Sequence, residues 1–255
     1  MSGIISAIHF TISQGINQYE KVKNIAVMKK FRRFCFGGRQ RRYDMSRKKG
    51  GTVKTLGAAI LAASSAVGKK EKEGPLGDLF DFSDPTDRFG QKTWERSESE
   101  MQRIVFSGAA GKLGIGEEDI DAVFAGDLLN QCVGSAYGLL QFDIPYFGLY
   151  GACSTMAESL MLASLLIDGC GAKKVAALTS SHFCSAERQF RTPLEYGGKR
   201  TPTAQWTATA AGACLVRGSG AAGVPVLSAT IGRVCDAGVK DINNMGAAMA
   251  PAAAQ

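Results

Sequence analysis

A short apolar strand that turns directly into a long apolar helix is the feature of this sequence that most constrains its fold. The strand is expected over residues 146–150 and the helix over residues 154–167, where Glu158 is the one charged side chain. A helix that is apolar on all sides is typical of a buried, central helix. A further strand is expected over residues 174–179, directly after the glycines that end this helix. This arrangement predicts an α/β domain.

The same alternation of strands and helices precedes that junction. Apolar residues at helical spacing predict a helix over residues 95–112. The segment 120–126 has the composition of a strand, and the residues after it lead into a helix that reaches about Leu140. Loops at such strand ends commonly line binding sites in α/β folds.

The second part of the chain is predicted to hold a loop and two more strands. The polar segment 180–200 is rich in turn-forming residues, which indicates a surface or pocket loop. Segments 211–217 and 224–234 are predicted as strands, and the Gly-Ser-Gly that begins at Gly218 indicates a hairpin between them. The predicted fold class is therefore α/β, with helices layered on a sheet.

Positive charge is concentrated at the start of the chain. Residues 1–50 hold 12 of the 30 Lys and Arg residues but two of the 23 Asp and Glu residues, so residues 51–255 are mildly acidic. We interpret residues 1–50 as a basic extension that is disordered or contains a mis-assigned start, in which case residues 1–44 are upstream sequence and Met45 is the true start. Residues 51–255 are interpreted as the folded part. Binding of nucleic acid or an anionic surface by the extension is a weaker alternative, since the folded part is not basic.

The apolar segments and the cysteine and histidine residues of the sequence indicate neither a membrane span nor a metal site. The apolar run over residues 56–63 is too short to cross a membrane, which takes about 20 apolar residues. Seven cysteines are widely spaced without a C-x-x-C pair, and the two histidines are His9 and His182. This pattern fits a reducing compartment and supports neither a disulfide framework nor a zinc site. We expect no metal and no cofactor.

Cys153 is the leading candidate for a functional residue because it lies between the predicted strand and the start of the long helix. The unpaired N–H groups and the positive dipole end of a helix favour a thiolate and also bind anions. Cys153 could therefore be a nucleophile or the floor of an anion site. A small buried apolar cysteine is the structural alternative.

Four other polar residues follow predicted strand ends. His182 and Arg188 lie in the segment after the strand at residues 174–179, where they could donate hydrogen bonds to an anion. Asp127 and Asn130 follow the strand at residues 120–126 and could approach the same crevice. As alternatives, Asp127 and Asn130 could cap the next helix, and Arg188 could be a solvated loop charge.

Four sequence blocks together resemble a known family, and they are Lys70–Asp81, Ala125–Gln131, Gly151–Thr155 and Thr179–Gly198. The Gly-Ala-Cys-Ser-Thr block is shared broadly among thiolases and ketosynthases. Gly-Asp-Leu-Leu-Asn-Gln combined with Ala-Glu-Arg-Gln-Phe-Arg is much more specific. From about residue 53 onward, the chain resembles the stage V sporulation protein AD family of the thiolase-like superfamily.

This resemblance implies a layered α-β-α fold, of which the chain would supply the first of two similar halves. It also implies binding of dipicolinic acid, free or as its calcium chelate, and action with other SpoVA proteins in moving it into the developing spore. Matching positions in the family's motifs are Cys153, His182, Asp127, Asn130 and Arg188. A homodimer through the thiolase-like interface is expected, as is a location in the cytoplasm or at the inner membrane of the developing spore.

The same resemblance argues against catalysis by this chain. In thiolases the second half supplies the histidine and second cysteine that catalysis needs, whereas this sequence has no histidine after His182. We therefore expect a non-enzymatic binding protein and a sequence that is part of a longer product. The alternative is an acyltransferase of the thiolase or ketosynthase class that uses Cys153 as its nucleophile.

Overall fold

The computed structural model describes residues 51–54, 57–190, 207–218 and 223–232, together with 236, 238–240, 246–247 and 249–250. The basic extension predicted over residues 1–50 lies outside this part of the chain. The strands are β1 (Gly51–Lys54), β2 (Ala59–Gly68), β3 (Phe82–Asp84), β4 (Ala122–Gly126), β5 (Tyr146–Gly148), β6 (Lys174–Ser181), β7 (Ala210–Arg217), β8 (Val224–Pro225) and β9 (Ser228–Ile231). The α-helices are α3 (Lys69–Lys72), α4 (Trp94–Leu113), α5 (Val133–Gly138), α6 (Thr155–Cys170) and α7 (Phe183–Phe190).

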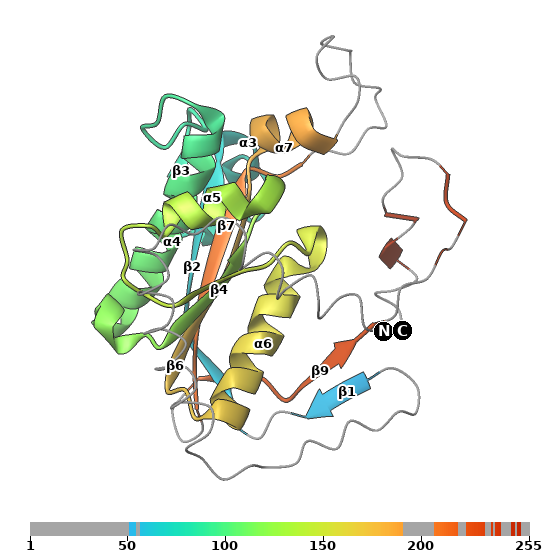
Figure 1. The fold of residues 1–255 in the computed structure, drawn as a ribbon. Helices are drawn as coiled ribbons and strands as arrows, with labels where there is room; N and C mark the ends of the chain where they lie inside the picture. The colour runs from blue at the N-terminus through green and yellow to red at the C-terminus, as the bar shows by residue number, and fades with distance from the viewer. Residues whose placement is uncertain are drawn as a thin grey trace, which may run out of the picture.

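One mixed sheet forms the centre of the described structure. Its strand order is β3-β2-β7-β6-β4-β5, and β8 lies beside β2. Strands β5, β4 and β6 run parallel, whereas β7 is antiparallel to both β6 and β2. Helices α4 and α5 lie on one side of this sheet and α6 on the other (Figure 1). The expected layered α/β architecture is confirmed.

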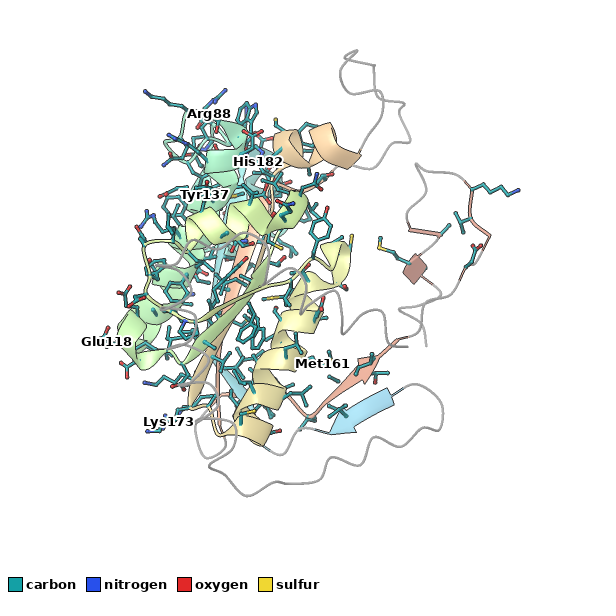
Figure 2. The ribbon with its side chains drawn as sticks, in the orientation of Figure 1. Arg88, Glu118, Tyr137, Met161, Lys173 and His182 are labelled. Carbon is teal, nitrogen blue, oxygen red and sulfur yellow. The ribbon has the colours of Figure 1, made fainter. Side chains whose placement is uncertain are left out.

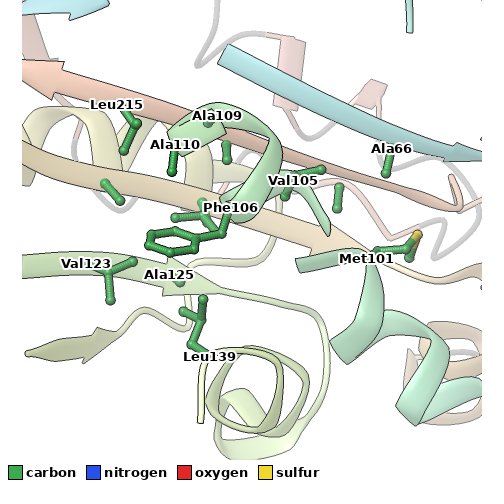
Figure 3. Close-up of a cluster of buried hydrophobic side chains, with 14 of the residues drawn as sticks. Ala66, Met101, Val105, Phe106, Ala109, Ala110, Val123, Ala125, Leu139 and Leu215 are labelled. Carbon is green, nitrogen blue, oxygen red and sulfur yellow. The ribbon is translucent and has the colours of Figure 1, made fainter. Parts of the chain in front are cut away.

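Alternate residues of β4 and β6 face opposite helix layers, as the two-residue period of a strand requires. The residues that join the core beneath α4 are Val123, Ala125, Ala176 and Leu178. Those that join the core beneath α6 are Ala122, Phe124, Val175 and Ala177. Figure 3 shows the first core, in which Phe106 of α4 packs with side chains of β4 such as Val123 and Ala125. Continuing the alternation, Ser180 of β6 faces the α4 side.

Helix α4 confirms the helix predicted over residues 95–112, and both of its ends have recognisable caps. The backbone N–H of Arg96 donates a hydrogen bond of 3.3 Å to Oγ1 of Thr93. At the other end Gly114 has a φ of 63°, the left-handed conformation that glycine adopts most readily. The buried face of α4 is mainly apolar but also contains Glu98 and Gln102.

Helix α6 covers the other face of the sheet but is only partly buried. Ala163, Leu166 and Ile167 join the core beneath it, whereas Met161 and Leu165 stay half-buried. The prediction of a buried, central helix applies to one face only in the described structure, where the helix packs on β4, β6 and β7. Ala152–Cys170 is long and apolar enough to cross a membrane, as core helices of soluble proteins also are.

Two further predictions are corrected by the structure. Residues 183–190, expected in a loop, form helix α7, while residues 191–206 lie outside the described part. The hairpin expected at Gly218 does not join the strands on either side of it, because both edges of β7 are already occupied by β2 and β6. Strand β8 pairs with β2 instead, and β9 pairs with β1.

Candidate anion site at the strand ends

The candidate site lies where β4 and β5 end and where α6 begins. The N–H of Leu149 donates to the carbonyl of Ala125 at 2.8 Å, and the thiol of Cys132 donates to the carbonyl of Leu149 at 3.2 Å. The hydroxyl of Tyr150 donates to Oδ1 of Asn130 at 3.0 Å. The loops after the two strands are therefore joined to each other, and Asn130 belongs to this junction. In Figure 2, Tyr137 and His182 lie at this end of the sheet.

Cys153 lies on the exposed surface next to these joined loops. It occupies a single 3-10 turn, Ala152–Ser154, that continues into α6, and its free thiol is exposed. The N–H groups of Ser154 and Thr155 donate to the carbonyls of Gly151 and Ala152, whereas the described structure gives the N–H groups of Ala152 and Cys153 no backbone acceptor. No side chain caps the helix at Ser154, whose hydroxyl donates to the carbonyl of Gly151 at 2.8 Å. These open donors suit an anion.

Backbone strain gathers in the same two loops. Gln131 and Cys132 have φ values of 60° and 56°, and Ala152 has a φ of 48°. Left-handed conformations are costly for residues with a Cβ, by about 1 kcal/mol each, and they cluster at functional sites. Burial raises the pKa of the Cys132 thiol, so Cys132 is suited to a neutral hydrogen bond and not to nucleophilic attack.

Asp127 continues β4 and holds the following loop in place. Its Oδ1 accepts from the N–H of Leu129 at 2.8 Å, and its Oδ2 accepts from the N–H of Ser135 at 2.6 Å and from the Ser135 hydroxyl. The carboxylate is 1% exposed. Its oxygens thus cap α5, which is the structural alternative to ligand binding, while contact with a ligand stays a prediction.

Sequence analysis missed a second buried carboxyl group beside Asp127. Glu98 of α4 is fully buried, and it accepts hydrogen bonds from Ser180 at 3.1 Å and Ser185 at 2.7 Å. The backbone N–H of Leu128 also donates to it. Burial, assisted by the nearby Asp127, raises the pKa of Glu98 to about 7. Its side chain therefore changes protonation near neutral pH.

Gln102 connects Glu98 and Asp127 through shared partners. Its amide nitrogen lies 3.1 Å from the Gly126 carbonyl, 3.0 Å from the Ser135 hydroxyl and 2.9 Å from the Ser180 hydroxyl. The polar network thus ties α4 to the ends of β4 and β6 and to the start of α5. A signal for it was present in the sequence, since Glu98 and Gln102 are one turn apart on the stripe that holds Met101 and Val105.

His182 is fully buried and has both ring nitrogens engaged. The N–H of Cys184 donates to Nδ1 at 3.2 Å, so the ring proton lies on Nε2, which donates to the Asp87 carbonyl at 2.8 Å. Trp94 lies against the ring, with centroids 5.2 Å apart. Burial lowers the pKa of His182. This geometry supports a structural role, and no observation supports the predicted ligand contact of His182.

Replacing His182 with glutamine is expected to remove one source of acid sensitivity. The pKa of His182 is lowered in the fold, so below about pH 6.5 the unfolded chain binds a proton that the folded chain refuses, and stability falls as pH decreases. Thermal melts of the wild type and His182→Gln at pH 5.5 and 7.5 measure this. An equal loss of melting temperature in both proteins would contradict the assignment.

The remaining predictions concern Arg188 and metal binding. Arg188 lies in helix α7, but its side chain is outside the described part, so its contact with a ligand stays a prediction. Within the described residues no group of three or more His, Cys, Asp or Glu side chains could hold a metal ion. Of the predicted residues, the structure brings Cys153, Asn130 and Asp127 to one pair of joined loops.

Comparisons with known proteins agree on a family. The family model of stage V sporulation protein AD matches residues 52–255. The stage V sporulation protein AD of Bacillus subtilis (strain 168) is 45% identical over 195 residues, which make up 76% of this chain and 57% of that protein. The chain thus spans less than two-thirds of the length of this curated relative.

Two solved structures are similar to part of this chain. The 3-oxoacyl-[acyl-carrier-protein] synthase III of Aquifex aeolicus VF5 is 16% identical with a TM-score of 0.44, over 64% of this chain and 54% of that one. The priming β-ketosynthase of the R1128 polyketide biosynthetic pathway is also 16% identical, with a TM-score of 0.41, over 65% of this chain and 51% of that one.

Proposed function

Because this chain belongs to the stage V sporulation protein AD family, we propose that it binds dipicolinic acid, free or as its calcium chelate, without catalysing a reaction. It then serves uptake of this solute into the developing spore, together with other SpoVA proteins. We place it in the cytoplasm or at the inner membrane of the developing spore, where partners or a surface patch hold it.

The observation that supports this proposal best is the open start of α6 beside an exposed Cys153. Two backbone N–H groups, those of Ala152 and Cys153, lack a backbone acceptor in the described structure, and no side chain caps the helix. Dipicolinate is a planar ring with two carboxylates, and helix N–H groups bind such anions through charge-assisted hydrogen bonds. The strained, joined loops around Cys153 hold these donors in a fixed geometry.

Two variants of Cys153 test the proposal by calorimetry with dipicolinate, in the presence and absence of calcium. Cys153→Ser keeps the size of the side chain and is expected to bind within about threefold of the wild type, since the backbone supplies the donors. Cys153→Trp places a large ring over those donors and is expected to abolish binding. Absence of binding by the wild-type chain, or equal binding by Cys153→Trp, would overturn the proposal.

Replacing Glu158 with glutamine is expected to strengthen binding. Glu158 lies in the first turn of α6, and its carboxylate lies against Gly151, where it repels an incoming dicarboxylate. Removing one such charge near a helix start changes affinity by about two- to fivefold. Calorimetry with dipicolinate measures the gain. The matched control is Glu118→Gln, at the opposite end of the sheet in Figure 2, which should leave the affinity unchanged.

Acyl transfer is the second candidate, and the exposed, free thiol of Cys153 favours it. The thiolate would attack the carbonyl of an acyl thioester, form a new thioester on Sγ and release the thiol of the donor. Mass spectrometry after incubation with acetyl-CoA detects such an adduct. An acetyl group on Cys153 in the wild type, absent from Cys153→Ser, would establish this chemistry, whereas an unmodified chain that binds dipicolinate supports the binding function.

A further inference from the structure

Glu98 is a fully buried carboxyl group whose partners are all neutral donors. Ser180 of β6 and Ser185 of α7 donate their hydroxyls to it, and Leu128 donates its backbone N–H. A buried carboxylate without a cation is costly, which favours the protonated form. The group can exchange a proton with solvent near neutral pH, since its pKa is about 7.

The charged and titratable groups around Glu98 leave it without a positive partner in the described structure. The end of β4 supplies the carboxylate of Asp127, whose negative charge acts on Glu98. The segment before α7 supplies His182, whose pKa is lowered by burial of the ring. Strand β6 and helix α5 supply the hydroxyls of Ser180 and Ser135, and on α4 itself Glu95 is one turn away.

A short series of contacts links Glu98 to the candidate anion site. Leu128, which donates to Glu98, precedes the loop that holds Asn130 and Cys132. On the other face of β4, a Cβ on Gly126 would lie 2.7 Å from the methyl group of Thr155, the first residue of α6. Glu98 and Asp127 on one side and the start of α6 on the other thus flank the same end of β4.

We propose that Glu98 takes up a proton when an anionic ligand occupies the start of α6, so that a dicarboxylate and a proton bind together. This inference rests on the proposed binding function and adds its proton partner. A bound dianion adds negative charge to a region that already contains Asp127 and Glu98. Like charges repel strongly in a medium of low dielectric constant, and protonation of Glu98 removes one of them. The proton comes from solvent and stays on the Glu98 carboxyl group.

Linkage fixes the direction of the pH dependence. When ligand binding is accompanied by uptake of a proton, the affinity for the ligand decreases as pH rises, because the proton concentration in the solvent is then lower. A rise of one unit in the pKa of Glu98 on binding would weaken dicarboxylate affinity about sixfold between pH 6.5 and 8.5. The ligand itself does not contribute, since carboxyl groups of this kind are ionised throughout that range.

Calorimetry of dipicolinate binding at pH 7.5 in two buffers with different ionisation enthalpies tests the proposal. The wild-type chain is expected to take up about half a proton per ligand, seen as a difference in binding enthalpy between the buffers. Glu98→Gln is expected to bind with no proton uptake and with equal affinity at pH 6.5 and 8.5. Glu118→Gln, the matched surface control, should behave as the wild type does.

The possible outcomes separate this inference from the proposed function. No binding at any pH refutes the proposed function itself. Binding without proton uptake in the wild type refutes the role of Glu98, and this result does not depend on whether Glu98→Gln folds. Proton uptake that persists unchanged in a folded Glu98→Gln protein, shown by circular dichroism, also refutes it, because another group would then bind the proton.

Discussion

Replacing Glu98 with glutamine is expected to stabilise the folded chain by about 3 kcal/mol at pH 8 and by less than about 1 kcal/mol at pH 5. The reason is the raised pKa of Glu98, which is about 7 in the fold against an ordinary value of 4.5. Between these two values the unfolded chain has lost a proton that the folded chain still holds. Stability contributed by this group therefore falls as pH rises from 4.5 to 7 and is constant above that.

Urea unfolding of the wild type and Glu98→Gln at several pH values between 5 and 8 measures this effect. The amide oxygen of the glutamine can accept from the N–H of Leu128, and its NH2 group can donate to a hydroxyl oxygen of Ser180 or Ser185. The network of hydrogen bonds therefore survives the change. Glu118→Gln, an exposed site, is the control and should follow the wild type at every pH. A Glu98→Gln protein that is less stable than the wild type at pH 8 would show that the ionised carboxylate is favoured in the fold.

Replacing Asp127 with alanine is expected to cost about 3–5 kcal/mol, the largest loss among the site residues. The change leaves the N–H of Leu129 and both donors of Ser135 buried without an acceptor. It also releases a loop in which Gln131 and Cys132 hold left-handed conformations. Urea unfolding measures the loss, and a cost below about 1 kcal/mol would contradict the capping role of Asp127.

A double-mutant cycle separates the hydrogen bonds of Asp127 from its charge. Asp127→Asn keeps an acceptor oxygen but removes the negative charge that acts on Glu98. In that background the stabilisation by Glu98→Gln at pH 8 should be smaller than in the wild type, because the repulsion between the two carboxylates has gone. An unchanged stabilisation would mean that burial alone sets the proton affinity of Glu98.

The elements that follow a clear periodicity were predictable from the sequence. Helix α4, strand β4 and strand β6 lie where apolar spacing places them, to within a few residues at each end. The junction between β5 and α6 also lies where predicted, with Cys153 at its exposed mouth. These positions depend on local residue patterns, and local patterns determine which face of a helix or strand is buried.

Features that depend on contacts between distant segments were not predictable in the same way. The burial of His182 depends on the Asp87 carbonyl and on Trp94, about 90 positions earlier in the chain. The pairing of β8 with β2 depends on the occupied edges of β7. Glutamate residues in an amphipathic helix usually face solvent. Glu98 can be buried because Ser180 and Ser185, from distant segments of the chain, donate hydrogen bonds to it.

Alkylation of Cys153 tests the central claim most directly, because the exposed thiol reports on the start of α6. The rate of reaction with iodoacetamide, followed by mass spectrometry of the Cys153 peptide, is expected to fall at least about tenfold at saturating dipicolinate. Cys170, at the other end of α6, provides the internal reference and should react at an unchanged rate. Measurable binding of dipicolinate with no change in the Cys153 rate would contradict the account.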